Sequence, residues 1–122
     1  MDTSFLLALV TKPIKLLFDD IIINYGKINF LIPDTVIDEL NKIKKRKSYK
    51  ISQMARTALE IAKQFEIVNT KKLWYPDDSL LDYAISYNTA IATLDKNLIK
   101  RSLSENIMVF SLKNNKIIII NC

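Results

Sequence analysis

The sequence contains no histidine, and it has only one cysteine, one glycine and three prolines in 122 residues. The absence of histidine excludes catalytic triads that use a histidine base, and it excludes most zinc hydrolase sites. The single cysteine, Cys122, excludes an internal disulfide and any zinc site built on several cysteines, in agreement with a reducing cytosol. Hydrolytic chemistry in this chain must therefore use carboxylates, lysine or oxygen-ligated metal ions.

Long hydrophobic runs are also absent. The first apolar stretch, residues 5–10, is too short to span a bilayer and lacks the pattern of a signal peptide. We therefore expect a soluble, cytoplasmic protein that does not act on membranes. Hydrophobic residues make up 49% of the chain, which predicts one globular domain over residues 1–122. The net charge of +5 favours a polyanionic partner such as nucleic acid.

The pattern of apolar residues predicts helices that alternate with strands. Helices are expected over residues 3–10, 13–25, 34–43, 51–65, 76–88 and 95–106, with Gly26 ending the second and Asp34 capping the third. Strands are expected over residues 27–33, 65–68, 90–94, 107–112 and 116–121, the last two as a hairpin. This order predicts an α/β fold with a mainly parallel sheet and an antiparallel edge. Ligands of such sheets bind beyond the carboxyl ends of the strands.

Helical angles, at about 100° per residue, indicate which acids face that edge. In helix 34–43, Glu39 borders the buried stripe. Ile51 begins the apolar, buried face of helix 51–65. The apolar, buried face of helix 76–88 is formed by Leu80, Leu81, Ala84 and Ile85. Asp77 projects near its centre, and Asp78 lies at its margin. The sequence therefore places Glu39 and Asp77 at or beside buried surface, where an unpaired carboxylate is unfavourable.

Each acid also has a purely structural interpretation. Asp2 or Thr3 could cap the first helix, and Asp77 and Asp95 could cap later ones. Glu39 could be a partly solvated edge residue paired with a nearby lysine. No single acid is diagnostic, so the functional hypothesis depends on the set.

Four short motifs carry these acids: MDTSFLLAL, FLIPDTVIDEL, PDDSLLDYA and AIATLDKNLIKR. In this order and at these separations they resemble the acidic motifs of PIN-domain nucleases, over nearly the whole chain. The resemblance is closest to archaeal stand-alone PIN proteins and to eukaryotic PIN endonucleases that cleave pre-rRNA, and it is compatible with VapC toxins. It implies a PIN-like three-layer α/β/α domain.

The resemblance also implies roles for individual residues. The catalytic, metal-binding acids would be Asp2, Glu39, Asp77 and Asp95, with Glu39 either a ligand or the group that positions the attacking water. The supporting residues would be Ser4, Thr93 and Asp78, and capping of the first helix would pass to Thr3 or Ser4.

Clustered carboxylates repel one another, so such a site implies a cation. Mg²⁺ or Mn²⁺ prefers oxygen ligands, and a pair of such ions about 4 Å apart can activate water and stabilise the leaving oxygen. The predicted function is a metal-dependent endoribonuclease that acts on single-stranded or structured RNA. The resemblance implies a 5′-phosphate and a 3′-hydroxyl on its products. The alternative is a catalytically inactive PIN-fold module that binds RNA or a partner protein. The resemblance further implies a homodimer, and either an antitoxin or a ribosome-assembly partner.

A basic run, NKIKKRKSYK at residues 41–50, follows the helix that carries Glu39. It is either a solvated face or a phosphate-binding patch that makes RNA binding sensitive to salt. The candidate RNA-binding residues are Lys42, Lys44, Lys45, Arg46, Lys47 and Lys50. Tyr49, Trp74 and Tyr75 either stack on bases or cap the core.

Only Met1 precedes Asp2, whereas the PIN pattern has several apolar residues there that form a central strand. We therefore expect a truncated first strand. Either the true start lies upstream, or the gap is filled by other residues or by another chain.

Overall fold

The computed structural model describes residues 1–10, 30–46, 48–71, 73, 75–113 and 116–120. The helices are α1 (Thr3–Val10), α3 (Asp34–Ile43), α4 (Tyr49–Ala62), α5 (Pro76–Tyr87) and α6 (Lys96–Ser104). The strands are β1 (Leu31–Pro33), β2 (Glu66–Val68), β3 (Ile91–Ala92), β4 (Val109–Lys113) and β5 (Lys116–Ile120). The helix predicted over residues 13–25, its Gly26 cap and the first residues of the strand predicted over 27–33 lie outside the described residues.

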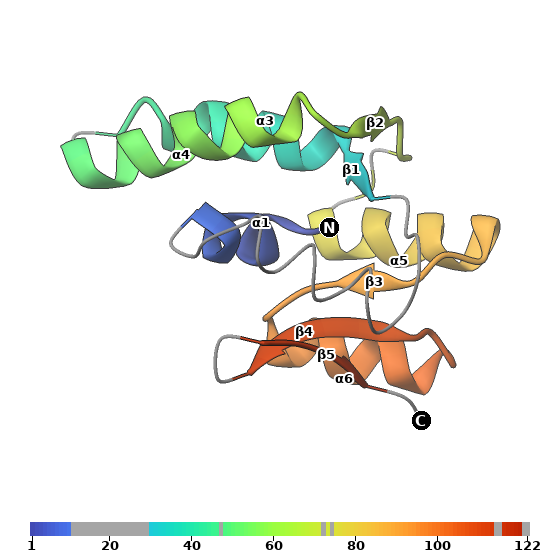
Figure 1. The fold of residues 1–122 in the computed structure, drawn as a ribbon. Helices are drawn as coiled ribbons and strands as arrows, with labels where there is room; N and C mark the ends of the chain where they lie inside the picture. The colour runs from blue at the N-terminus through green and yellow to red at the C-terminus, as the bar shows by residue number, and fades with distance from the viewer. Residues whose placement is uncertain (11–29, 47, 72, 74, 114–115, 121–122) are drawn as a thin grey trace.

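The strands form two small sheets that lie side by side (Figure 1). Strands β1 and β2 pair in parallel, β3 and β4 pair in parallel, and β4 and β5 form the predicted antiparallel hairpin. In Figure 1 the strands succeed each other in the order β2, β1, β3, β4, β5, with the N-terminus between β1 and β3. The mainly parallel fold with an antiparallel edge is therefore confirmed.

Residues 1 and 2 connect the two sheets. The Met1 nitrogen donates a hydrogen bond to the Leu31 oxygen (2.8 Å), and the Asp2 amide donates one to the Ala92 oxygen (2.9 Å). These two residues thus lie between β1 and β3 and link the two sheets through backbone hydrogen bonds. The expectation of a truncated first strand stays a prediction. A hollow of about 260 Å³ extends from Met1 between the two strands.

Helices cover both faces of the sheets, which makes three layers. On one face, α1, α3 and α4 enclose a core that includes Phe5, Leu40 and Ala58. On the other face, α5 and α6 pack on a second core around Leu81 and Leu98. Strand β3 supplies both cores, because Ile91 belongs to the second and Ala92 to the first, as expected for side chains that alternate along a strand. That residues 1–122 form a single domain stays a prediction.

Three local predictions are wrong. Pro33, not Asp34, is the N-cap of α3, and Asp34 instead accepts hydrogen bonds from the Thr70 amide (3.1 Å) and hydroxyl (2.8 Å) in the loop after β2. Ile51 and Ile85, predicted as buried, are exposed, because each helix extends past the part of the core that it covers.

No described helix is both long and apolar enough to cross a membrane.

Candidate active site

The four predicted acids line one small pocket of about 130 Å³. They come from four separate places in the chain: Asp2 precedes α1, Glu39 lies on α3, Asp77 lies in the first turn of α5, and Asp95 precedes α6. Pro33, at the carboxyl end of β1, also lines the pocket. The pocket therefore lies at the carboxyl ends of the parallel strands, where the topology predicts a ligand site.

Asp2 is half-buried and held by four hydrogen bonds. Its carboxylate accepts from the Ser4 hydroxyl (2.8 and 3.0 Å to the two oxygens), from the Phe5 amide (2.9 Å) and from the Thr93 hydroxyl. The bond from Phe5 is an N-cap of α1, so the expectation that capping passes from Asp2 to Thr3 or Ser4 is wrong. One carboxylate both caps the helix and faces the pocket.

Ser4 and Thr93 join the start of α1 to the end of β3. The Ser4 oxygen accepts from the Leu94 amide (3.0 Å), and the Thr93 oxygen accepts from the Asp95 amide (3.0 Å). Each hydroxyl thus has a backbone donor on one side and the Asp2 carboxylate on the other. These hydroxyl and amide donors fix the direction of the Asp2 oxygens.

Burial changes the electrostatics of this end of the chain. It raises the pKa of Asp2 above its ordinary value, and the hydrogen bonds from Thr93, Phe5 and Ser4 oppose that rise. Burial also lowers the pKa of the Met1 amino group to about 6, with a smaller opposing effect of Asp2.

Glu39 is tied to the first motif by a residue that the sequence reasoning missed. The buried Thr3 hydroxyl donates to one oxygen of the Glu39 carboxylate (2.8 Å), which spans from α1 to α3. The Glu39 side chain is otherwise exposed at the pocket, so its second oxygen is available there. The only sequence signal for this bond was the position of Thr3 between Asp2 and Ser4.

Asp77 and Asp95 occupy different environments. Asp95 is exposed and caps α6, accepting from the amides of Asn97 (2.8 Å) and Leu98 (3.2 Å), so the capping interpretation is confirmed for it. Asp77 is half-buried and makes no cap bond on α5. Burial raises the pKa of Asp77, the Asp95 and Asp2 carboxylates raise it further, and Arg101 opposes them. Asp77 therefore lies in the field of the other acids without a compensating cap.

Arg101 of α6 is a second residue missed from the sequence. Its guanidinium forms an ion pair with Asp78 at 2.5 Å, which joins α5 to α6 beside the pocket. Asp78 itself does not line the pocket. Asp78 holds the Arg101 guanidinium near Asp77, where its positive charge partly offsets the repulsion from the other carboxylates.

The donor chemistry of the pocket suits a hard cation. Four carboxylates and the Ser4 hydroxyl offer only oxygen, which matches Mg²⁺ or Mn²⁺ and not a metal that prefers sulfur or imidazole. Burial raises the pKa of Asp77 most and repulsion from Asp95 and Asp2 raises it further, and a cation would relieve that repulsion. As the described side chains stand, however, no three of them converge closely enough to hold one ion together.

The basic run lies away from the acids. Lys42, Lys44, Lys45 and Arg46 lie at the C-terminal end of α3, and Lys50 opens α4, whereas Lys47 lies outside the described residues. None of the described basic residues of the run lines the acidic pocket. Tyr49 and Tyr75 are exposed, so neither caps the core, and Trp74 lies outside the described residues.

The raised pKa values predict how stability depends on pH when no metal is added. A carboxyl with a raised pKa holds its proton more tightly in the folded state, so its contribution to stability is lost as the pH rises from 3.8 through the folded value. Asp77→Asn should therefore have a higher Tm than the wild type at pH 7.5, and the difference should shrink towards pH 4. Thermal unfolding followed by circular dichroism across this range tests it, and an Asp77→Asn protein less stable than wild type at pH 7.5 would refute the assignment.

Comparisons with known proteins agree with this geometry. The profile of the PIN-like domain family matches residues 1–115. The chain is 34% identical to Ribonuclease VapC9 of Archaeoglobus fulgidus over 92 residues, which cover 75% of this chain and 67% of that protein. The structure of the PIN domain endonuclease Utp24 superposes with a TM-score of 0.78 at 28% identity, covering 99% of this chain and 89% of that one. On the strength of this match and of the four motifs that meet at one pocket, the chain belongs to the PIN-domain family of nucleases.

Proposed function

We propose that this protein is a metal-dependent endoribonuclease that hydrolyses phosphodiester bonds of single-stranded or structured RNA. The observation that carries the proposal is the meeting of Asp2, Glu39, Asp77 and Asp95 in one pocket at the carboxyl ends of β1 and β3. The names of the two relatives, a ribonuclease and an endonuclease, support the same activity. We propose that the protein acts in the cytoplasm, where RNA and Mg²⁺ are both present.

In the proposed mechanism, Asp2, Asp77 and Asp95 would hold Mg²⁺ or Mn²⁺. When bound, the ion lowers the pKa of water and stabilises charge on the leaving oxygen. Ser4 and Thr93 keep the Asp2 oxygens directed at the pocket. Glu39, fixed through one oxygen by Thr3, uses its other oxygen to orient the attacking water. Cleavage would leave a 5′-phosphate and a 3′-hydroxyl.

The cations at the end of α3 would contact the RNA backbone beyond the pocket. Lys42, Lys45, Arg46 and Lys50 are exposed and lie on the helix pair that carries Glu39. We propose that they bind phosphates several nucleotides away from the scissile bond, since they do not line the pocket. Their contribution should weaken as salt increases.

A cleavage assay tests the proposal directly. End-labelled RNA and DNA oligonucleotides are incubated with the protein in Mg²⁺, in Mn²⁺ and in EDTA, and the product ends are identified by their susceptibility to phosphatase. We expect RNA cleavage in either metal, none in EDTA, and 5′-phosphate products. Cleavage that persists in EDTA, or products with a 2′,3′-cyclic phosphate, would contradict the mechanism.

The Thr3–Glu39 hydrogen bond makes a separate prediction. Thr3→Val keeps the shape of the buried side chain but removes the donor, so kcat should fall by about 10–100-fold while KM for RNA changes little. Thr57→Val is a matched control, because the Thr57 hydroxyl donates to the Gln53 carbonyl on the exposed side of α4, outside the acidic pocket. Steady-state kinetics that show an unchanged kcat for Thr3→Val would remove Thr3 from the mechanism.

One observation favours a second candidate, a catalytically inactive module that binds RNA or a partner protein. As placed, no three of the described carboxylates converge on one ion. Under this alternative, RNA binding would not change on addition of Mn²⁺ or EDTA, and no cleavage would occur.

Whether an active enzyme serves as a toxin restrained by an antitoxin or as an RNA-processing enzyme is tested by co-purification of a small partner from the native host. Sedimentation of the purified protein tests the expected homodimer.

A further inference from the structure

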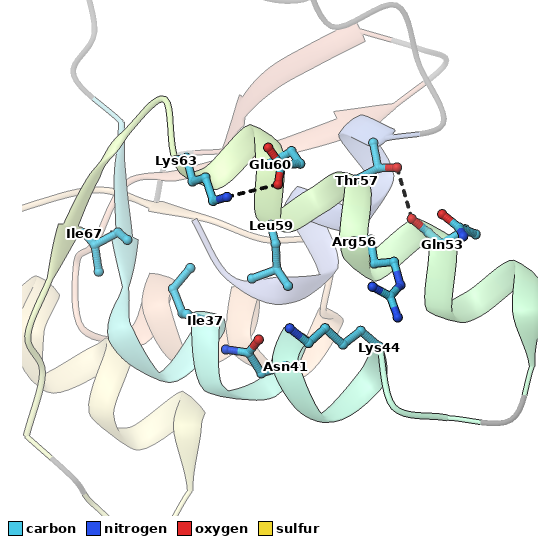
Figure 2. A pocket seen from close by; sticks show the side chains of 10 residues that line it. All are labelled: Ile37, Asn41, Lys44, Gln53, Arg56, Thr57, Leu59, Glu60, Lys63 and Ile67. Atoms are coloured by element: carbon cyan, nitrogen blue, oxygen red, sulfur yellow. Dashed lines mark hydrogen bonds and ion pairs between the residues drawn. The ribbon is translucent and has the colours of Figure 1, made fainter.

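A groove of about 620 Å³ runs between α3 and α4 and ends at β2. Figure 2 shows its lining, with Ile37 and Lys44 on α3, Arg56 and Leu59 on α4, and Ile67 on β2. The groove is separate from the acidic pocket, since no described residue lines both. It has no part in the proposed cleavage.

The fully buried residues of α3 and α4 are not the ones that line the groove. Leu40 of α3 and the small residues Ala55, Ala58 and Ala62 of α4 are buried in the same core. Along α3, Ile37 lies two positions from Glu39, which places it about 160° around the helix from the acid. The helix thus presents Glu39 to the pocket and Ile37 to the groove.

The floor of the groove is aliphatic and open to solvent. Ile37 and Leu59 are partly buried against the core, and Ile67 is 49% exposed. Ile67 belongs to β2, whose only strand partner among the described residues is β1. Three branched side chains in one concave surface form a larger apolar patch than isolated surface residues do.

The rim of the groove is positively charged. The described lining includes three basic side chains, Lys44, Arg56 and Lys63. It includes one carboxylate, Glu60, which forms an ion pair with Lys63 (3.0 Å). Arg56 lies on α4 and Lys44 at the C-cap of α3; in Figure 2 the Arg56 guanidinium points towards α3, and the Lys44 amine extends along α3 towards Asn41. Neither has a carboxylate partner within the part of the chain that the structure describes. Two cations at one groove, neither of them paired with a described carboxylate, favour an anionic occupant.

The chemistry of the lining distinguishes a protein occupant from RNA. None of the described residues that line the groove is aromatic, so it offers no surface on which bases stack. An aliphatic floor beneath cationic side chains instead complements a helix that carries leucine or isoleucine on one face with aspartate or glutamate beside them. We propose that the groove between α3 and α4 is a docking site for an acidic amphipathic helix of a partner protein.

Selection from a displayed library of helical peptides tests the proposal. The library fixes leucine or isoleucine at i, i+3, i+4 and i+7 and varies the flanking positions among acidic, basic and neutral residues. It is selected on the wild-type protein and depleted on Arg56→Glu. We expect the enriched peptides to carry aspartate or glutamate beside the apolar positions, and their affinity for Arg56→Glu to be at least about tenfold weaker than for wild type.

Controls separate this site from general charge effects. Lys100→Glu, an equal charge change at an exposed position of α6, should leave peptide affinity unchanged. Ile67→Ser should weaken binding without any change of charge, and a peptide with lysine in place of its acid should regain affinity for Arg56→Glu. Enrichment of peptides without acids, or equal affinity for wild type and Arg56→Glu, would overturn the proposal. Loss of RNA affinity in Arg56→Glu with no selected peptide would identify the groove as a nucleic-acid surface instead.

Discussion

Asp77→Asn should reduce the rate of RNA cleavage by at least about 100-fold, because it removes one of the four carboxylate charges that act together at the scissile phosphate. Asp77 is the acid with the strongest signs of crowding: it is half-buried, it makes no cap bond, and both Asp95 and Asp2 raise its pKa. The substitution keeps nearly the same shape. Single-turnover cleavage of a labelled RNA in Mn²⁺ measures the effect.

A matched control lies on the same helix. Asp82 of α5 lines a different surface hollow, outside the acidic pocket, so Asp82→Asn should cleave RNA at close to the wild-type rate. Circular dichroism on both variants checks that the fold is retained. If Asp77→Asn and Asp82→Asn lose the same small fraction of activity, the pocket is not the site of cleavage.

Phe5→Ala should have the largest effect on stability. Phe5 is fully buried on α1, in the core that α1 shares with α3 and α4. Removing a buried aromatic ring lowers the free energy of unfolding by about 3–5 kcal/mol, which for a chain of this size lowers Tm by roughly 10–20 °C. Since α1 also fixes Asp2 and Thr3, activity should be lost at temperatures well below the wild-type Tm.

Leu7→Ala supplies the comparison for this prediction. Leu7 lies on the same helix but is only partly buried, so its truncation should lower the free energy of unfolding by about 1 kcal/mol. Urea unfolding of both variants measures the two values. Equal losses for Phe5→Ala and Leu7→Ala would show that α1 does not pack in the core as the structure places it.

The order and type of the described elements could be predicted because their signals are local. Apolar spacing identifies α3 and α4, and Pro76 marks the start of α5. The apolar runs at residues 107–112 and 116–121 predict the β4–β5 hairpin. Exact boundaries depend on tertiary contacts, so β3 is two residues long instead of five. The burial of Ile51 and Ile85 was wrong for the same reason, because helical periodicity does not reveal how far the opposing core extends.

The members of the acidic pocket could also be proposed from the sequence. Helical angles favoured Asp77 over Asp78, and the structure places Asp77 in the pocket and Asp78 in an ion pair with Arg101 outside it. Their catalytic and metal-binding roles stay predictions. The prediction that Thr3 or Ser4 caps the first helix is wrong, because the Asp2 carboxylate both caps α1 and faces the pocket.

The contacts between distant hydroxyls and acids could not be predicted. The bonds from Thr3 to Glu39 and from Thr93 to Asp2 join residues 36 and 91 positions apart, and each depends on how α1 meets another element. No single-residue preference encodes such a pairing. The charged groove between α3 and α4 was hidden in the same way, because its lining comes from three elements.

Calorimetric titration of Mn²⁺ into the metal-free protein tests the central claim most directly, namely that the four carboxylates form a metal centre for RNA cleavage. The wild type and Asp82→Asn should show saturable binding, and Asp77→Asn and Asp95→Asn should bind at least about tenfold more weakly. The absence of saturable binding by the wild type, or equal binding by Asp77→Asn, would contradict the account.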